Sequence, residues 1–162
     1  MFSIIVIVFD QVTKLLVKYF FERGQPHQII GDFVRLTYIE NPGMAFGIQI
    51  GGQLFFTIFA AVASVIIFIY IVRARNEKFL SRFALALILG GALGNLIDRF
   101  LYGKVIDFID IGINNTRWPI FNLADSSVTI GMIILVAMVL FDKSDKKEEE
   151  NKEVAAEDQA YT

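Results

Sequence analysis

The chain has 162 residues, of which 55% are hydrophobic and 14% aromatic, and its mean hydropathy is +0.56. It is too short for several domains and too apolar for a soluble domain. We therefore expect a single integral membrane domain. It contains no cysteine and one histidine, His27, which excludes disulfides, thiol nucleophiles and zinc sites with several histidines. The net charge of −2 is the sum of two unlike parts: residues 142–162 carry eight acids and four lysines, and the rest of the chain carries eleven bases and nine acids. We expect no nucleic-acid partner.

Four apolar segments fit membrane-spanning helices, because about twenty such residues cross a ~30 Å hydrocarbon core. We expect these spans at about 1–21, 54–72, 83–97 and 126–141. The first has no basic leader and no small-residue cleavage pattern, so we expect a retained helix rather than a cleaved signal peptide. The third carries Gly90, Gly91 and Gly94, whose spacing lets helices approach closely.

Polar residues within the first and third spans fall on helical faces. Asp10 and Lys14 are i,i+4 neighbours that can neutralise each other, and Gly91 and Asn95 share a face with a charged residue at 98 or 99. Both faces should point into the helix bundle rather than toward lipid. Two interpretations stay open: a buried ion pair and an amide that only set the helix register, or side chains that also shape a polar cleft beneath an active site.

The two longer connections between spans contain strand patterns. The segment Phe33-Val-Arg-Leu-Thr-Tyr-Ile39 is rich in β-forming residues and is followed by the turn Asn41-Pro-Gly43. Residues 105–111 and 118–121 flank a second turn-like stretch. We therefore expect a small β-sheet on the outer membrane surface, where its aromatic residues would suit the interfacial zone. The expected fold class is an α-helical membrane protein with four transmembrane helices and this sheet.

Basic residues set the expected topology. Four of the ten residues in 73–82 are basic, and positive charge in short loops stays cytoplasmic. Lys143, Lys146 and Lys147 follow the last span and agree with this orientation. Both termini should therefore face the cytoplasm, and both longer connections should face outward. Residues 142–162 have too little apolar content to pack, so we expect a disordered charged tail after a membrane domain of residues 1–141, with a frayed helical extension as the alternative.

Asp107 and Asp125 are the candidates for chemistry, because each lies where an apolar element meets the outer surface. Asn122 can cap a helix that has Asp125 in its first turn, and a helix start favours an ionised carboxylate. Asp107 lies among apolar neighbours, which raise the pKa of a carboxyl group. Two carboxyls in opposed environments can share one proton, as in aspartic proteases. The ordinary alternative is a capping aspartate and an unrelated strand aspartate.

Five motifs occur along the chain in a fixed order: Asp10-Gln-Val-Thr-Lys14, Asn41-Pro-Gly-Met-Ala-Phe-Gly47, Gly91-Ala-Leu-Gly-Asn-Leu-Ile-Asp-Arg99, Val105-Ile-Asp-Phe-Ile109 and Trp118-Pro-Ile-Phe-Asn-Leu-Ala-Asp-Ser126. Together they resemble the motifs of the lipoprotein signal peptidase family, also called signal peptidase II, over roughly residues 4–141. The resemblance implies an aspartic endopeptidase of the bacterial inner membrane, with its active site at the outer face. Such enzymes remove signal peptides from prolipoproteins by cutting before a cysteine that already carries diacylglycerol.

The resemblance also assigns roles to individual residues. It makes Asp107 and Asp125 the catalytic pair, and Asp10 and Lys14 a structural polar core. It implies that a further set of residues lines or supports the substrate site: Asn41, Gly43, Asn95, Arg99 and Asn122. No metal or organic cofactor is implied. The implied partners are diacylglyceryl-prolipoprotein substrates, membrane lipid and globomycin-like inhibitors.

The chain departs from the family ahead of its first motif. Phe2 to Phe9 supply only eight residues, which is about 12 Å of helix at 1.5 Å per residue, whereas the family usually has a longer segment there. We therefore expect Asp10 to lie deeper in the bilayer than its family position would.

Three other functions can be weighed from the sequence. A proton- or ion-coupled transporter could use the acidic residues as a relay, but it should show paired repeats with broken helices, and no repeat is evident. A structural membrane subunit would tolerate Asp107→Asn. An intramembrane metalloprotease is disfavoured because the chain has no His-Glu-x-x-His motif.

Overall fold

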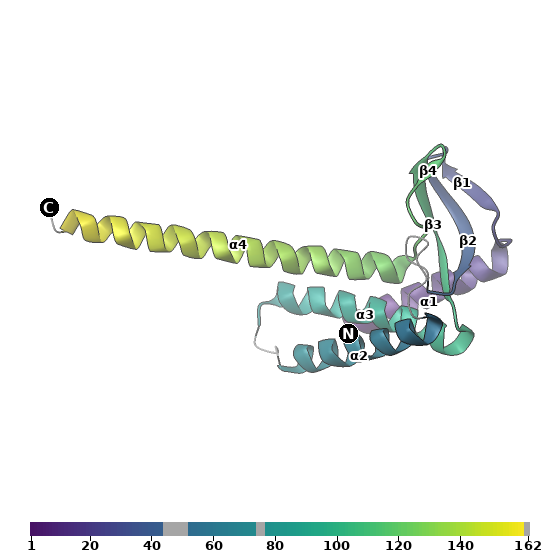
Figure 1. The fold of residues 1–162 in the computed structure, drawn as a ribbon, viewed down its shortest axis with the longest axis horizontal. Coiled ribbons are helices and arrows are strands. Elements are labelled where there is room, and N and C mark those ends of the chain that lie inside the picture. Colours follow the sequence, from purple (N-terminus) through teal and green to yellow (C-terminus); the bar gives the residue numbers. More distant parts are fainter. Residues whose placement is uncertain (44–51, 74–76, 161–162) are drawn as a thin grey trace.

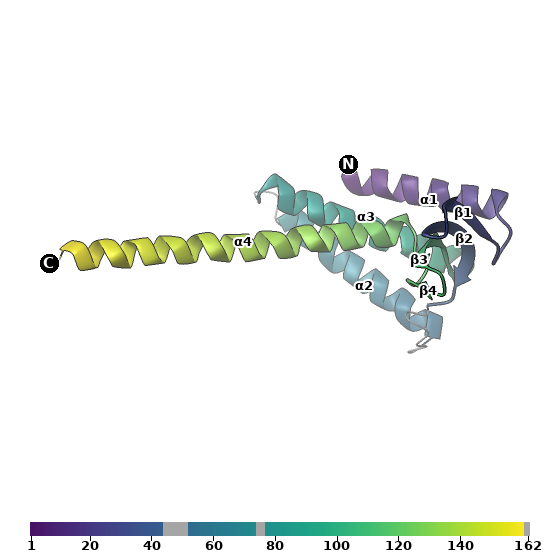
Figure 2. The ribbon, with the colours of Figure 1, turned by 90° about the horizontal axis from the view of Figure 1, so that it is seen from above.

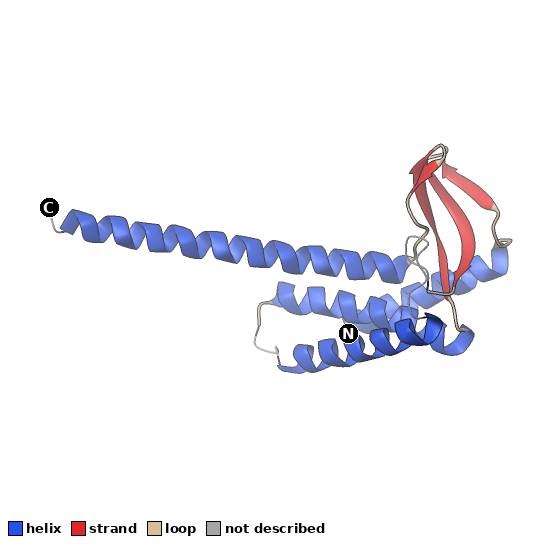
Figure 3. Ribbon diagram, in the orientation of Figure 1, coloured by secondary structure: helices blue, strands red, loops and turns tan. Residues whose placement is uncertain are grey.

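The computed structural model describes residues 1–43, 52–73 and 77–160. Helices make up most of it, and a small sheet stands at one end of the helix bundle (Figures 1 and 3). The elements in chain order are α1 (Phe2–Phe20), β1 (Pro26–Ile30), β2 (Val34–Asn41), α2 (Gly52–Arg73), α3 (Phe79–Tyr102), β3 (Val105–Ile113), β4 (Thr116–Arg117) and α4 (Leu123–Ala160).

Three helices of the described ranges are long and apolar enough to cross a membrane. They are Leu54–Arg73, Phe79–Tyr102 and Leu123–Phe141, so three of the four predicted spans are confirmed with somewhat longer bounds. The first predicted span forms α1, which carries three charged residues, Asp10, Lys14 and Lys18, and does not meet the same criterion. The fourth span therefore stays a prediction. Most side chains of α2 are exposed and apolar, which suits contact with lipid rather than water.

Helix α3 is the centre of the bundle, because it contacts each of the other three helices (Figure 2). Its small residues make this possible. A Cβ atom on Gly90 would lie 2.7 Å from the Cβ of Val6 in α1, and one on Gly91 would lie 2.3 Å from the carbonyl oxygen of Ala124 in α4. The predicted close approach of helices at these glycines is confirmed.

Gly91→Ala should destabilise the fold although alanine favours a helix more than glycine does. The added methyl group would meet the backbone of α4, which cannot move without shifting the first turn of that helix. We expect overpacking to cost roughly 1–3 kcal/mol, seen as a lower melting temperature of the purified protein in detergent. Ala92→Ser, one position along the same helix, is the matched control. A Gly91→Ala protein as stable as the parent would contradict the packing described here.

The sheet is antiparallel with strand order β1-β2-β3-β4. Strands β2 and β3 pair with Ile39 opposite Asp107 and Asn41 opposite Val105. The predicted strands at 33–39 and 105–111 are confirmed. Phe121 forms an isolated bridge with Ile109 rather than part of a longer strand. Strand β1 was not predicted, because its residues are all exposed and show no alternation of buried and exposed positions.

A small hydrophobic core holds the sheet on the end of α1. It consists of Val17, Tyr38, Ile106 and Phe108, which are all buried. Val17 lies on α1, Tyr38 on β2, and the other two on β3 on either side of Asp107. Burial of the side chains that flank Asp107 in the chain therefore positions this carboxyl group at the junction of sheet and helices.

Helix α4 runs to Ala160, whereas disorder was expected from residue 142. It extends well past the other helices (Figure 1). The expectation of disorder rested on the low apolar content of the segment, which limits tertiary packing. A helix also depends on the intrinsic propensity of its residues. Lysine, glutamate and alanine, which are frequent after residue 141, are good helix formers. That residues 142–162 form a separate tail outside the functional domain stays a prediction.

Candidate active site

Asp107 and Asp125 come from different elements and share their hydrogen-bonding partners. Asp107 lies on β3 and is 2% exposed. One of its oxygens, Oδ1, accepts a hydrogen bond from Asn122 Nδ2 at 2.7 Å, and Oδ2 accepts one from Asn41 Nδ2 at 3.0 Å. Both carboxylate oxygens of Asp107 are thus fixed by amide donors.

Asp125 is held by the helix cap that the sequence predicted. The backbone N–H of Asp125 donates to Asn122 Oδ1 at 3.0 Å, and the backbone N–H of Asn122 donates to Asp125 Oδ2 at 3.2 Å. This reciprocal pattern is a capping box at the start of α4. The other oxygen, Asp125 Oδ1, accepts a 2.7 Å hydrogen bond from Asn95 Nδ2. The cap therefore orients the carboxylate as well as stabilising the helix.

Asn122 connects the two aspartates. Its side chain is fully buried, and its Nδ2 lies within hydrogen-bonding distance of Asp107 Oδ1, of Asn95 Oδ1 at 3.0 Å and of the Ile106 carbonyl at 3.2 Å. Its Oδ1 at the same time accepts from Asp125. A single amide therefore contacts both acidic residues and the strand that carries one of them.

The environments of the two carboxyl groups differ as the sequence indicated. The pKa of Asp107 is raised to about 7, first by burial and second by the charge of Asp125, while hydrogen bonds from Asn41 and Asn122 oppose the shift. Asp125 lies in the first turn of α4, where the helix dipole favours negative charge. With its pKa raised to about 7, Asp107 can hold a proton near neutral pH beside a second carboxyl group in the same cleft.

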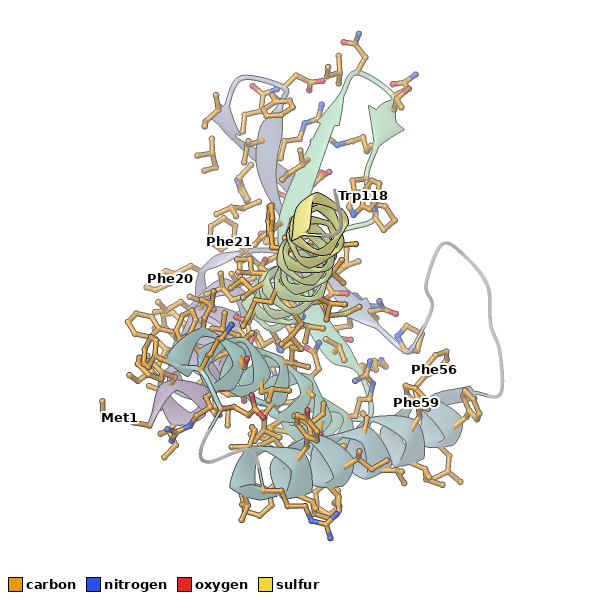
Figure 4. All side chains as sticks on the ribbon, turned by 90° about the vertical axis from the view of Figure 1, so that its left-hand side faces the viewer. Met1, Phe20, Phe21, Phe56, Phe59 and Trp118 are labelled. Atoms are coloured by element: carbon orange, nitrogen blue, oxygen red, sulfur yellow. The ribbon has the colours of Figure 1, made fainter. Side chains whose placement is uncertain are left out.

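Both aspartates open onto a cleft of about 260 Å³. Its lining combines polar residues with an apolar wall: Asn41, Gly43, Phe56, Arg99, Asp107, Trp118, Pro119, Ile120, Phe121 and Asp125. Figure 4 shows Phe56, from α2, and Trp118, from the segment before α4, on the same side of the molecule. Phe56 was not predicted as a site residue, because one aromatic in a span that is apolar throughout gives no local signal.

Asn41 and Gly43 form the edge of the cleft next to β2. The backbone N–H of Gly43 donates to Asn41 Oδ1 at 3.0 Å, so the side chain that holds Asp107 is itself held by the turn. Gly43 has a φ of 106°, which favours glycine, and a Cβ there would lie 2.8 Å from the ring of Phe56. Residues 44–47 of the predicted second motif lie outside the described residues.

Arg99 lines the same cleft as both acidic residues. It is the cationic group in the lining of the cleft. Two carboxylates could bind a hard cation, but the described part of the chain contains no group of three potential ligands. The chemistry for which this set of residues is suited is proton transfer.

A buried charged network lies beneath the cleft. Lys14 Nζ is 2.8 Å from Asp10 and 2.9 Å from Asp98, and it donates to Asn95 Oδ1 at 2.9 Å. The predicted ion pair of Asp10 and Lys14 is therefore confirmed, and Asp98 is a further member. Gln11, which was not predicted, also donates to Asp98 at 2.9 Å.

This network is joined to the elements that carry the site. Asp10 accepts a hydrogen bond from the backbone N–H of Ala124 at 3.0 Å, and Asp98 accepts one from that of Ile106 at 3.1 Å. These are neighbours of Asp125 and Asp107 in the chain. Asn95 joins Lys14 to Asp125. These side chains connect α1, α3 and α4; that they also shape a polar cleft beneath an active site stays a prediction, and the lining of the cleft includes none of Asp10, Lys14 and Asn95.

Comparison with known proteins agrees with this geometry. A family model described as signal peptidase (SPase) II matches residues 2–141. The chain belongs to the signal peptidase II family. Lipoprotein signal peptidases of Staphylococcus aureus strains JH9 and Newman are 39% identical over 150 residues, which is 93% of this chain and 92% of each relative.

Two solved structures have the same fold as this signal peptidase II family member. A bacterial membrane enzyme determined by the in meso method at 2.3 Å resolution superposes with a TM-score of 0.77 and 39% identity, covering 90% of this chain and 88% of that one. A second, at 1.9 Å resolution, gives a TM-score of 0.72 and 37% identity over 86% of this chain and 90% of that one. The family predicted from the five motifs is thus confirmed, and with it a bacterial membrane protein.

Proposed function

We propose that this signal peptidase acts as an aspartic endopeptidase, with Asp107 and Asp125 as its catalytic pair. Removal of signal peptides from prolipoproteins follows from the family. The observation that carries the catalytic assignment is the hydrogen-bonded unit in which Asn122 contacts both carboxyl groups at the edge of a cleft. Asn41, Asn95 and Arg99 complete the polar part of the site.

The proposed mechanism uses the opposed environments of the two acids. Asp125, ionised at the helix start, removes a proton from a water molecule that attacks the scissile carbonyl carbon. Asp107, protonated because its pKa is raised, gives its proton to the carbonyl oxygen. The proton held by Asp125 then passes to the leaving amine as the C–N bond breaks, and one hydroxyl of the gem-diol intermediate returns its proton to Asp107 as the new carbonyl forms. The positive charge of Arg99 stabilises the ionised member of the pair.

The substrate class follows from the other wall of the cleft. Phe56, Trp118 and Ile120 offer apolar surface beside the acids, and Trp118 is 62% exposed. Such a surface suits the acyl chains of a diacylglyceryl-modified prolipoprotein better than a soluble peptide. Cleavage before the lipidated cysteine is therefore the expected reaction.

A pair of matched substrates tests this function. Purified protein should cleave a prolipoprotein peptide that carries diacylglycerol on its cysteine, and it should leave the unlipidated twin intact. Product masses would place the cut before the modified cysteine. Equal cleavage of both peptides would indicate a general protease, and cleavage of neither would reject the proposal.

The membrane orientation is part of the same proposal. We propose that α1 is the fourth span, with its polar face against α3, that both termini are cytoplasmic and that the sheet lies at the outer surface. The basic residues of the 73–82 connection support this arrangement, although residues 74–76 lie outside the described part. A reporter fused after Lys78 should behave as cytoplasmic and one fused after Asn114 as external. The reverse pattern would place the site on the wrong side for secreted prolipoproteins.

The pKa of Asp107 gives a pH dependence. Turnover should fall as pH rises through about 7, because Asp107 then loses the proton that it must donate. The same group affects folding. Its folded pKa lies above the ordinary 3.8, so its stabilising contribution is complete below about pH 4 and is lost as pH rises toward and through 7.

Rate profiles and melting temperatures between pH 5 and 9 would check both effects. Asp107→Asn removes the titrating group, so its melting temperature should depend less on pH across this window than that of the parent. A parent enzyme whose turnover stays constant up to pH 9 would show that Asp107 is not the proton donor.

A further inference from the structure

A second cavity lies on the opposite face of the sheet from the aspartates. It has a volume of about 210 Å³ and is lined by Lys18, Glu40, Tyr102, Lys104 and Ile106. Glu40 and Asn41 are consecutive residues of β2, and successive side chains of a strand point to opposite faces. Asn41 contacts Asp107, whereas Glu40 lines this second cavity. The peptidase mechanism uses none of these five residues.

Three cations lie in or next to this cavity, and the acidic residue of its described lining is Glu40. Arg23 and Lys104 lie 3.2 Å and 3.3 Å from the same oxygen of Glu40. Lys18 Nζ lies 4.3 Å from the centre of the Tyr102 ring; among the described residues no carboxylate pairs with it. One glutamate cannot neutralise three cations, so the cavity carries an excess of positive charge.

Electrostatics at Glu40 agree with this excess. Burial alone would raise the pKa of Glu40, but hydrogen bonds from Lys104 and Tyr38 and the charges of Arg23 and Lys104 lower it below its ordinary value. Glu40 therefore stays ionised, and the surplus of two positive charges persists at neutral pH. A lysine in the last turn of a helix is ordinary, since it offsets the helix dipole, but that role needs one cation and not three.

The position of the cavity indicates what supplies the missing negative charge. It lies where α1 ends at Phe20 and the span Phe79–Tyr102 ends, so it is level with one surface of the bilayer. The residues close to Lys18 and Tyr102 in the chain are large and exposed, as expected for contact with lipid: Tyr19, Phe20, Phe100 and Leu101. Figure 4 shows Phe20 on the opposite side of the molecule from Phe56 and Trp118. The cavity therefore faces bulk lipid away from the catalytic cleft.

We propose that this cavity binds the phosphate of an anionic phospholipid from the leaflet on the sheet side of the membrane, with Lys18 and Lys104 as its principal ligands. Basic pockets between transmembrane helices bind anionic headgroups in this way. Arg23 is 61% exposed and can turn from Glu40 to the same phosphate. The acyl chains of the lipid would lie against the exposed side chains at the ends of α1 and α3.

Binding can be measured on the purified full chain in neutral detergent by native mass spectrometry. The probes are phosphatidylglycerol, phosphatidylcholine with the same acyl chains, and inorganic phosphate as a competitor. The parent protein should retain phosphatidylglycerol in preference to phosphatidylcholine. Inorganic phosphate, which lacks acyl chains, should not displace it at equal concentration. Displacement by inorganic phosphate, or equal retention of both lipids, would overturn the proposal.

Variants assign the binding to the cavity. Lys18→Gln with Lys104→Gln should weaken phosphatidylglycerol binding by roughly tenfold or more, since each lysine near an anionic headgroup contributes about fivefold. Replacing the same two residues by arginine should preserve binding. Lys78→Gln, at the other end of α3, removes one charge outside the cavity and should have little effect. Unchanged binding in the double glutamine variant would overturn the proposal.

A second pair of variants separates local from overall charge. Glu40→Gln should strengthen binding, because it removes the carboxylate that competes for the cations. Glu22→Gln changes the net charge equally, but Glu22 is exposed, bonds to Gln25 and lies outside the cavity lining, so it should change binding little. Equal strengthening by both variants would show a non-specific charge effect. Asp107→Asn should bind lipid normally, so a failure here is distinct from a failure of the peptidase proposal.

Discussion

Asp107→Asn and Asp125→Asn should each abolish cleavage, with turnover reduced by at least about 10³-fold. Asparagine keeps the size of the side chain but cannot exchange a proton at the pH of the reaction. Each variant should still fold and still bind a globomycin-like lipopeptide, because the apolar wall of the cleft is unchanged. The double variant should be hardly worse than either single one, since residues that act as one unit are not additive.

Asp110→Asn is the matched control for these variants. Asp110 lies on the same strand and is equally buried, but it bonds to Thr37 and Arg117 rather than to Asn122. This substitution should lower stability and leave turnover per folded molecule nearly unchanged. Substantial activity in Asp125→Asn, or a loss of activity on chelation that added metal restores, would refute the aspartic mechanism.

Lys14→Met should be the most destabilising single substitution in the buried network. It leaves Asp10 and Asp98 buried without a counter-charge, and loss of one partner from a buried ion pair costs about 3–5 kcal/mol. Because both aspartates bond to backbone groups next to the proposed catalytic pair, activity should fall with stability. Thermal unfolding in detergent would measure the first effect, and peptide cleavage would measure the second.

Lys18→Met, one turn further along α1, is the corresponding control. Lys18 is exposed, so its loss should change the melting temperature little. Adding Asp10→Asn and Asp98→Asn to Lys14→Met removes the uncompensated charges and should recover part of the lost stability. A Lys14→Met protein that melts with the parent would show that these ion pairs do not stabilise the fold.

Elements whose burial is evident from the pattern of polar and apolar residues within their own segment could be predicted from the sequence. The run from residue 54 to 72 contains no charged residue and is mostly apolar, and so it predicted α2 directly. The exposed strand β1 has no such pattern, and it is defined by its antiparallel pairing with β2. The end of α4 could not be predicted from packing criteria, because apolar content says nothing about intrinsic helix propensity, which is high for the lysine, glutamate and alanine residues after 141.

The candidate site shows the same division. Asn122 and Asp125 are three residues apart at a helix start, so their mutual cap could be predicted from spacing. Asp98 and Gln11 belong to different helices, and their contact depends on how α1 packs against α3. Only the tertiary structure brings Asn95 between Lys14 and Asp125. The resemblance to a family grouped Asn95 with Asp107 and Asp125 before the structure did, but it implied neither the contact between Gln11 and Asp98 nor the hydrogen bonds of Asn95.

Because Asp125 lies in the first turn of α4, the length of that helix sets the depth in the bilayer at which a substrate would be cut. From Leu123 to Phe141 the span has 19 residues, about 28 Å of helix at 1.5 Å per residue, close to the ~30 Å thickness of the hydrocarbon core. The proposed catalytic pair is thus held at one fixed height, at the rim of the core. A signal peptide whose own apolar helix is one turn too long would carry its scissile bond past that height, so selection would depend on depth in the bilayer as well as on the residues around the cut.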